Sequence, residues 1–169
     1  MNRVFVTADM HYGHTNIIKY ESRPFNNAED MDAALIKNWN KVVSKNDKVF
    51  VLGDVSFHNK EKTAEIVQQL HGRKFLVKGN HDQRNNQWFI DVGFDEVSSY
   101  PIIYKDWFVM QHEPPHYVND AMPFFFLYGH VHASEPYRTV TKTSACVSVE
   151  RWEYSPVEIE KIVELAKLV

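Results

Sequence analysis

The sequence predicts a single α/β domain in which strands and helices are layered. Short apolar or aromatic runs alternate with helical patterns through the first half of the chain. From Phe94 to Tyr154 the sequence instead reads as consecutive strands joined by turns, and both patterns fit one layered domain. The length of 169 residues also matches one domain, so residues 1–169 are expected to fold as one unit.

The strand candidates are runs of apolar, β-branched or aromatic residues. They are Val4–Ala8, Val49–Leu52, Phe75–Val77, Ile102–Tyr104, Phe108–Met110 and Phe124–Tyr128. Cys146 and its apolar neighbours indicate a further, buried strand. Because Cys146 is the only cysteine, the chain cannot form an internal disulfide, and a packing role is favoured over a nucleophilic one.

Three helices are predicted from apolar residues at helical spacing. The first covers about Glu29–Val43, with Asn27 as its N-cap and acidic residues in its first turn. The second covers Lys60–Leu70. The third runs to the end of the chain after a capping-box signature, which consists of Ser155, Pro156 and Glu158.

The charge and hydropathy of the chain limit its partners. A net charge of -3 and a pI near 6.3 argue against a broad basic surface that binds nucleic acid. No stretch approaches the length of a membrane span, and the run Val4–Ala8 is too short for the core of a signal peptide. We therefore expect a cytoplasmic protein without a membrane partner, while its oligomeric state stays open.

Four strand runs are followed at once by side chains that can bind metal ions. Parallel strands place such residues at one sheet edge, where open α/β sheets bind ligands. Residues at i and i+2 of an extended segment point to one side, so each Asp-x-His or His-x-His pair is expected to converge. The glycines beside them permit sharp turns and close approaches. The segments are Asp9 with His11, Gly53-Asp54, Gly79-Asn80-His81-Asp82, and Gly129-His130 with His132.

These motifs, in this order, resemble those of calcineurin-like metallophosphoesterases over most of the chain. The resemblance implies a four-layer α-β-β-α sandwich of two mixed sheets and a site for two divalent metal ions. Manganese is the first choice, with iron, zinc and nickel as alternatives for a site of carboxylate, amide and imidazole ligands. One ion would be held by Asp9, His11, Asp54 and His132, and the other by Asn80, His112, His130 and the bridging Asp54.

The resemblance also implies a mechanism. A water shared by both ions loses a proton near neutral pH and attacks phosphorus as a metal-bridging hydroxide, while the ions offset the developing charge. His81 corresponds to the histidine general acid that protonates the leaving oxygen, and Asp82 is grouped with it as catalytic. We therefore expect a metal-dependent phosphoric ester hydrolase.

Two departures from the family pattern bear on ligands and substrate. His112 is followed by Glu113-Pro114-Pro115-His116 where glycine is common, so His116 is a rival for the ligand position. The Asp and Arg that follow Gly-Asp in many protein phosphatases are replaced by Val55-Ser56-Phe57-His58, which disfavours that subtype. Other side chains must then meet the substrate phosphate, and the candidates are His14, Arg23, Arg84 and His116.

Phosphodiester hydrolysis is the favoured activity, with a phosphorylated small molecule, nucleotide or oligonucleotide as substrate. A phosphomonoesterase is the first alternative. A binding scaffold that keeps the fold without the chemistry, as a retromer subunit with this fold does, is the second, although His81 and every ligand position here carry suitable residues. A dedicated nucleic-acid-processing enzyme would share the chemistry but needs a basic track, which the overall acidity disfavours.

Overall fold

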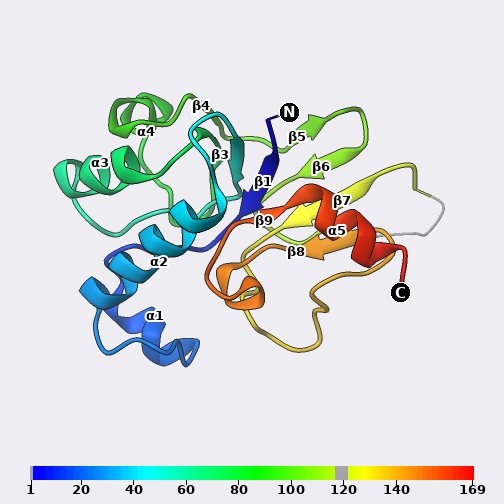
Figure 1. Ribbon diagram of the computed structural model, residues 1–169, viewed down its shortest axis with the longest axis horizontal. Coiled ribbons are helices and arrows are strands. Elements are labelled where there is room, and N and C mark those ends of the chain that lie inside the picture. The colour runs from blue at the N-terminus through cyan, green and yellow to red at the C-terminus, as the bar shows by residue number, and fades with distance from the viewer. Residues whose placement is uncertain (1, 117–121) are drawn as a thin grey trace.

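Two mixed β-sheets and five α-helices make up the described residues, 2–116 and 122–169, of the computed structural model (Figure 1). This confirms the predicted α/β sandwich of two mixed sheets flanked by helices. The helices are α1 (Thr15–Tyr20), α2 (Ala28–Val42), α3 (Lys60–Gln69), α4 (Asn86–Val92) and α5 (Ile159–Ala166).

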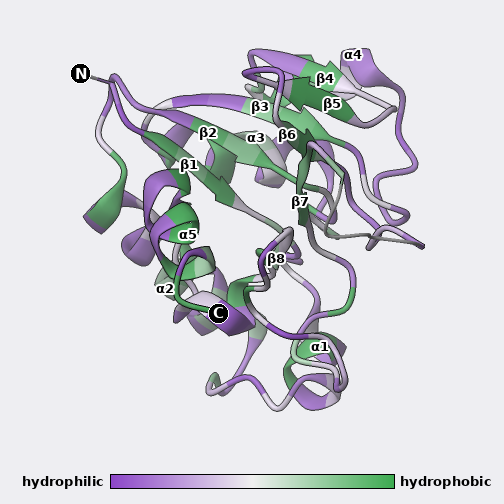
Figure 2. Ribbon diagram, turned by 90° about the vertical axis from the view of Figure 1, so that its right-hand side faces the viewer, coloured by the Kyte–Doolittle hydropathy of each residue, from purple (hydrophilic) through white to green (hydrophobic). Residues whose placement is uncertain are grey.

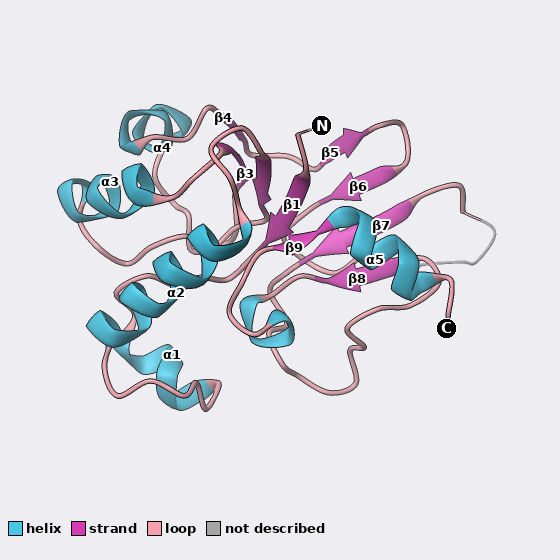
Figure 3. Ribbon diagram, in the orientation of Figure 1, coloured by secondary structure: helices cyan, strands magenta, loops and turns pink. Residues whose placement is uncertain are grey.

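The first sheet has the strand order β4-β3-β2-β1-β9, with β1 to β4 parallel and β9 antiparallel to β1. The second sheet has the order β5-β6-β7-β8, in which β5 and β6 are antiparallel and the other neighbours are parallel (Figure 3). The strands are β1 (Val4–Thr7), β2 (Lys48–Val51), β3 (Arg73–Val77), β4 (Glu96–Ser98), β5 (Ile102–Tyr104), β6 (Phe108–Met110), β7 (Phe125–Tyr128), β8 (Ser144–Cys146) and β9 (Val157–Glu158).

The first sheet is buried on both faces, and the alternation of its side chains explains why. Phe5 and Val49 point to a cluster that also holds buried residues of α2, α3 and α4. Val6 and Phe50 point to the opposite cluster, which contains Phe108 and other residues of the second sheet. β1 and β2 accordingly read mainly as apolar runs and are mostly green in Figure 2.

The predicted helices on the first sheet are confirmed within a residue or two. Asn27 caps α2 by accepting a hydrogen bond from the amide of Asp30 at 2.8 Å, as expected. The strand around Cys146 is confirmed as β8, with Cys146 fully buried. Within the described residues no helix is long and apolar enough to cross a membrane.

The predicted start of the C-terminal helix is wrong. Val157 and Glu158 form β9 and pair with Val6 and Phe5 of β1, so α5 begins only at Ile159. The hydroxyl of Ser155 donates to the carbonyl of Glu153 and caps no helix. Pairing with a central strand outweighs the local capping signal, and it leaves α5 beside β1, where its Ile159 packs into the core between the sheets.

Candidate functional site

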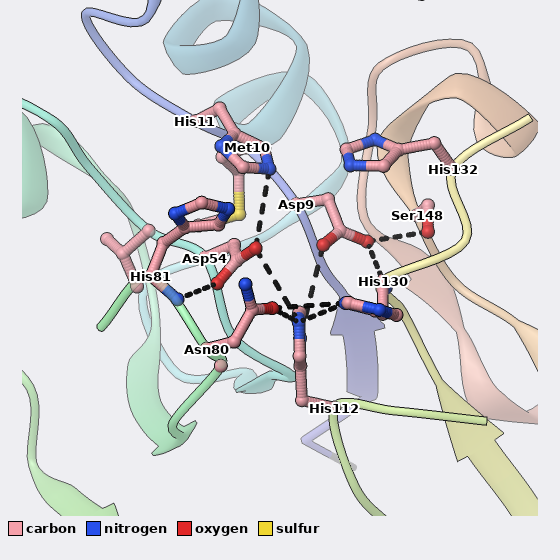
Figure 4. A network of polar contacts seen from close by, with 12 residues as sticks. Asp9, Met10, His11, Asp54, Asn80, His81, His112, His130, His132 and Ser148 are labelled. Atoms are coloured by element: carbon pink, nitrogen blue, oxygen red, sulfur yellow. Dashed lines mark hydrogen bonds and ion pairs between the residues drawn. The ribbon is translucent and has the colours of Figure 1, made fainter. Parts of the chain in front are cut away.

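Side chains from five strand ends meet at one edge of the sandwich (Figure 4). They follow β1, β2 and β3 in the first sheet and β6 and β7 in the second. Because neighbouring strands among these are parallel, their carboxyl ends open onto a shared crevice. The residues brought together are Asp9, His11, Asp54, Asn80, His81, His112, His130 and His132.

Five of these residues have a left-handed backbone conformation, which sets the direction of their side chains. The residues and their φ angles are Asp9 (60°), His11 (54°), Asp54 (57°), His130 (69°) and His132 (47°). A left-handed conformation costs about 1–2 kcal/mol in a residue with a Cβ, so neighbouring hydrogen bonds must hold it. Backbone pairing between β1 and β2 continues past both strand ends, where the amides of Asp9 and His11 donate at 3.0 Å to Gly53 and Asp54. The extended geometry expected for Asp9 and His11 is therefore wrong.

His130 and His132 turn to opposite sides of the site. The Nδ1 atom of His130 lies 3.0 Å from Asn80 Oδ1 and 3.2 Å from His112 Nε2. The ring of His132 instead stacks beside that of His11, with 5.1 Å between the ring centroids. The expectation that the two histidines converge on one point is wrong, whereas the separate grouping implied by the family resemblance agrees with the geometry.

Two groups of possible metal-donor atoms lie next to each other in the site. Asp9, His11 and His132 form one group and Asp9, Asp54 and His112 another, and within each the donor atoms lie within 4.8 Å of one another. The Oδ2 atom of Asp54 is 3.5 Å from Nε2 of both His11 and His112, so it lies between the groups. Asp9 is counted in both groups, but its Oδ2 already accepts bonds from the hydroxyl of Ser148 and the amide of His130. Asp54 Oδ1 likewise accepts the amide of His81, which leaves Oδ2 of Asp54 at equal distances from His11 and His112.

The chemistry of these atoms fits divalent metal ions. Within the described residues, Asp9 Oδ1 and both ring nitrogens of His11 are buried without a hydrogen-bond partner, a state that proteins rarely leave uncompensated. The His112 ring lies 2.9 Å from Asn80 Oδ1. Metal–ligand bonds of about 2.1 Å bring neighbouring donors to about 3 Å from one another. These Asp and His clusters are thus consistent with the two-metal site typical of the implied family.

His112 and His116, the two candidates for one ligand position, differ in burial and in contacts with the site. The Nδ1 atom of His112 lies 2.8 Å from the carbonyl oxygen of Leu52, a hydrogen bond that leaves Nε2 facing the site. His112 is buried, whereas His116 is exposed and belongs to neither donor group. Of the two histidines, the geometry therefore brings only His112 to the donor groups, and its role as a ligand stays a prediction.

Glycines allow the backbone to pack directly against the ligands. A Cβ on Gly129 would come within 2.6 Å of Asp9 Oδ2, and one on Gly53 would come within 2.5 Å of His112 Nδ1. Gly53 also has a φ of +90°, which favours glycine. The predicted role of glycine at these junctions, close approach beside the ligands, agrees with this geometry.

Arg23 lies behind the site and does not face a substrate. Its side chain is fully buried and donates to the carbonyls of Asp9 and Met10 at 2.7 and 2.9 Å. It also pairs with Glu150, whose Oε1 lies 2.9 Å from Nδ1 of His132. The suggestion that Arg23 clamps phosphate is therefore corrected: the arginine fixes the turn after β1 and the carboxylate that orients His132.

Ser148 and Glu150 were not identified from the sequence, although a signal was present. The hydroxyl of Ser148 donates to Asp9 at 2.6 Å, and Glu150 orients His132. Both follow the buried run that ends in Val147, so they repeat the pattern of polar residues after a strand that marks the other ligands. A serine and a glutamate are common after strands for other reasons, and the pattern alone did not single them out.

His81 and Asp82 hold different positions. The ring of His81 is exposed at the site, while its backbone amide donates to Asp54 Oδ1 at 3.0 Å. Asp82 is buried and accepts bonds from the amides of Gly79, Asp54 and Val55 at 2.7–3.1 Å. The hydrogen bonds of the Asp82 carboxylate thus hold the loops after β2 and β3 together. This suits a residue that positions His81.

Of the remaining substrate candidates, His14 and Arg84 lie beside the site. His14 occupies the N-cap position of α1 without a side-chain capping bond, and its ring stacks on Phe57 with 4.1 Å between centroids. Arg84 is exposed and lines a pocket next to His81. His58 is partly buried and pairs with Asp32 at 2.6 Å.

Burial shifts the protonation of the ligands. Burial raises the pKa of Asp9 from 3.8 to about 6, although the charges of His132 and His112 and a bond from Ser148 lower it. Burial, followed by the charges of His132 and Arg23, lowers the pKa of His11 to about 2, which keeps that ring neutral and ready to bind metal. Burial lowers the pKa of His132, but the Glu150 hydrogen bond and the Asp9 charge outweigh it and raise the pKa overall.

Asp9→Asn should stabilise the metal-free protein at neutral pH. Because the folded-state pKa of Asp9 is raised, its favourable contribution is present below about pH 4 and is lost as the pH rises through about 6. The shift corresponds to about 3 kcal/mol, so the stability of Asp9→Asn relative to wild type should rise by up to that amount between pH 4 and pH 8. Urea unfolding of both proteins after chelator treatment measures this difference, and a difference independent of pH would contradict the prediction.

Comparison with known proteins supports the same identification. The model of the calcineurin-like phosphoesterase family matches residues 2–161. The uncharacterized protein MJ1445 of Methanocaldococcus jannaschii is 34% identical over 171 residues, covering 98% of this chain and 92% of that protein. The Gene 66 protein of Mycobacterium phage L5 is 34% identical over 85 residues, covering 48% of this chain and 41% of the phage protein.

Two solved structures share the fold. The protein of unknown function AQ665 from Aquifex aeolicus superposes with a TM-score of 0.74 at 24% identity, covering 98% of this chain and 100% of that chain. The nuclease MPE of Pseudomonas putida superposes with a TM-score of 0.53 at 20% identity, covering 78% of this chain and 62% of that chain. With the family match over residues 2–161 and the clustered Asp and His ligands, the chain belongs to the calcineurin-like phosphoesterase family.

Proposed function

We propose that the chain is a phosphoesterase that uses two divalent metal ions and prefers phosphodiesters. The observation that carries the proposal is the position of Asp54 Oδ2, at 3.5 Å from Nε2 of both His11 and His112. One carboxylate oxygen equidistant from ligands of two groups suits a bridge between two ions. Asp9, His11 and His132 would hold one ion, and Asn80, His112 and His130 the other.

Two bound ions would lower the pKa of a water and offset the negative charge that develops on phosphate. The protein supplies the rest of the chemistry. The buried carboxylate of Asp82 fixes the loop that carries His81, and the bond from the His81 amide to Asp54 ties that loop to the metal ligands. The exposed His81 ring is free to donate a proton to the leaving oxygen. Asp82 therefore acts as a positioning residue in this proposal.

The preference for diesters follows from the cations near the site. A monoester dianion carries an extra charge that phosphatases meet with fixed cations. Arg23 is buried and paired, and Val55–His58 stand where protein phosphatases carry Asp and Arg. Arg84 is the remaining arginine candidate, and it is exposed. A diester with a single negative charge needs no such clamp.

We expect a higher kcat/KM for bis(4-nitrophenyl) phosphate than for 4-nitrophenyl phosphate, after correction for their uncatalysed rates. Both substrates should be assayed at one pH with manganese, after chelator treatment, and the series repeated with iron, zinc and nickel. Arg84→Ala serves as the companion variant. A monoester preference that collapses in Arg84→Ala would overturn the diester assignment and identify the arginine as a phosphate clamp.

A further inference from the structure

An open pocket of about 460 Å³ adjoins His81. It is formed by the loop after β2 and by the segment that runs from His81 into α4, and its walls include Phe57, Gln83, Arg84 and Trp88. Figure 4 places His81 on the opposite side of the site from His130 and His132. The pocket is therefore next to the residue proposed to protonate the leaving oxygen.

Phe57 brings an aromatic surface to this pocket. Its ring centroid lies 4.1 Å from that of His14, nearly parallel at 15°, and 5.3 Å from that of His81. His14 thus covers one face of the ring. Phe57 nevertheless stays 45% exposed, so aromatic surface remains open to a ligand beside the acid.

Some polar side chains of the pocket are hydrogen-bonded inside the protein, and others are not. Ser56, His58 and Asp82 are each hydrogen-bonded inside the protein. Within the described part of the chain, the side chains of Gln83 and Arg84 have no hydrogen-bond partner and are exposed. An amide and a guanidinium are therefore available to a ligand that also contacts the aromatic wall.

We propose that this pocket binds a nucleoside leaving group, so that the substrate is a nucleotide or oligonucleotide phosphodiester. This inference rests on the proposed hydrolysis. The bond between phosphorus and the leaving oxygen breaks, a water oxygen bonds to phosphorus, and His81 gives its proton to the leaving oxygen. The group attached to that oxygen then lies on the His81 side, where the base stacks on Phe57 and its edge meets Gln83 and Arg84.

An aromatic surface beside the polar side chains of Gln83 and Arg84 favours a nucleobase among common leaving groups. A base offers a flat face that stacks and an edge with several donors and acceptors. A lipid alcohol offers neither, and a tyrosine ring offers a face without such an edge. A choline or ethanolamine group is a cation, which the exposed guanidinium of Arg84 would repel, and the one carboxylate lining this pocket, Asp82, is bonded to backbone amides.

The test compares two dinucleotides on the metal-loaded protein. One is a thymidine dinucleotide, whose products identify the leaving nucleoside, and the other lacks the base on that nucleoside. We expect kcat/KM to be about tenfold or more higher with the base present, the effect of one base–aromatic stack. Phe57→Ala and Phe57→Leu should remove this preference and Phe57→Tyr should keep it. Arg84→Ala should weaken the preference for the base, and Lys45→Ala, which removes an exposed charge at the other end of β2, is its matched control.

Binding without turnover separates this inference from the proposed function. A dinucleotide with a non-hydrolysable methylphosphonate link, and its analogue without the leaving-side base, are titrated calorimetrically into wild type and Phe57→Ala. Tighter binding of the complete dinucleotide by wild type alone supports the pocket even if no diester is cleaved. Equal binding of the two compounds, or equal kcat/KM for the two substrates, overturns the nucleoside pocket while leaving the hydrolase intact. Failure to cleave any phosphodiester overturns the proposed function instead.

Discussion

Asp54→Asn should lose metal and lower kcat/KM by about a thousandfold or more, equal to roughly 4 kcal/mol of transition-state stabilisation. The Oδ2 atom of Asp54 lies between His11 and His112, and its Oδ1 accepts the His81 amide. Asparagine can keep the bond from that amide through its oxygen. It then presents an uncharged nitrogen that cannot bind a cation where Oδ2 stood. The loss should therefore fall on metal binding rather than on folding.

Elemental analysis measures this result directly. Wild type under saturating manganese should bind two ions per chain and Asp54→Asn fewer, with the remaining ion weakly held. Asp47→Asn is the matched control because Asp47 is also a buried carboxylate beside β2, at the opposite end of the strand, where it pairs with Arg3. It should keep both ions. A wild type that binds only one ion at saturation, or an Asp54→Asn protein that keeps two, would contradict the shared role of Asp54.

The ligands could be predicted from the sequence because each follows an apolar run. A parallel strand must be apolar to be buried on both faces, and the chain turns at its carboxyl end. Asp9, Asp54 and Asn80 therefore stand out as possible metal ligands two or three positions after the last residue of each strand. The same reason explains why the four parallel strand ends could be expected to meet.

The direction in which each side chain points could not be predicted. Asp9 and His11 were expected to converge through an extended segment, yet both are left-handed. Positive φ is more frequent in Asp and His than in most residues with a Cβ, but it stays uncommon, and here tertiary hydrogen bonds such as those to Gly53 and Asp54 impose it. His130 and His132 separate for the same reason, although their spacing suggested one point.

The roles of Arg23 and Glu150 in supporting the ligands were not predicted because the two residues are distant in sequence. Arg23 and Glu150 are 127 residues apart, and only the folded chain brings them together behind His132. An arginine in a loop looks like a solvated charge, and nothing local distinguishes a buried one. Short elements such as α4 and β9 were missed too, because a helix of 7 residues and a strand of two depend on packing rather than on periodicity.

His81→Ala should keep both ions and lose about a hundredfold or more of its turnover with substrates that have an alkoxide leaving group. The reason is that His81 contributes to the metal ligands only through its backbone amide, which alanine retains. Its ring lies 5.6 Å from that of His11, centroid to centroid, and belongs to neither donor group. Elemental analysis should accordingly give the wild-type metal content. His71→Ala, which removes a partly buried histidine at the far end of β3, should change neither property.

The dependence on leaving group distinguishes an acid from a residue that merely shapes the site. A nitrophenolate leaves without a proton, so its hydrolysis should fall little in His81→Ala, whereas a nucleoside or alkyl leaving group should lose the full contribution of the acid. A plot of log kcat/KM against the pKa of the leaving group should therefore become steeper in the variant. A residue that only packed against Phe57 and His11 would lower all rates by one factor and leave the slope unchanged. If His81→Ala released a metal ion, its ring would be a ligand, and the proton would have to reach the leaving oxygen from another group.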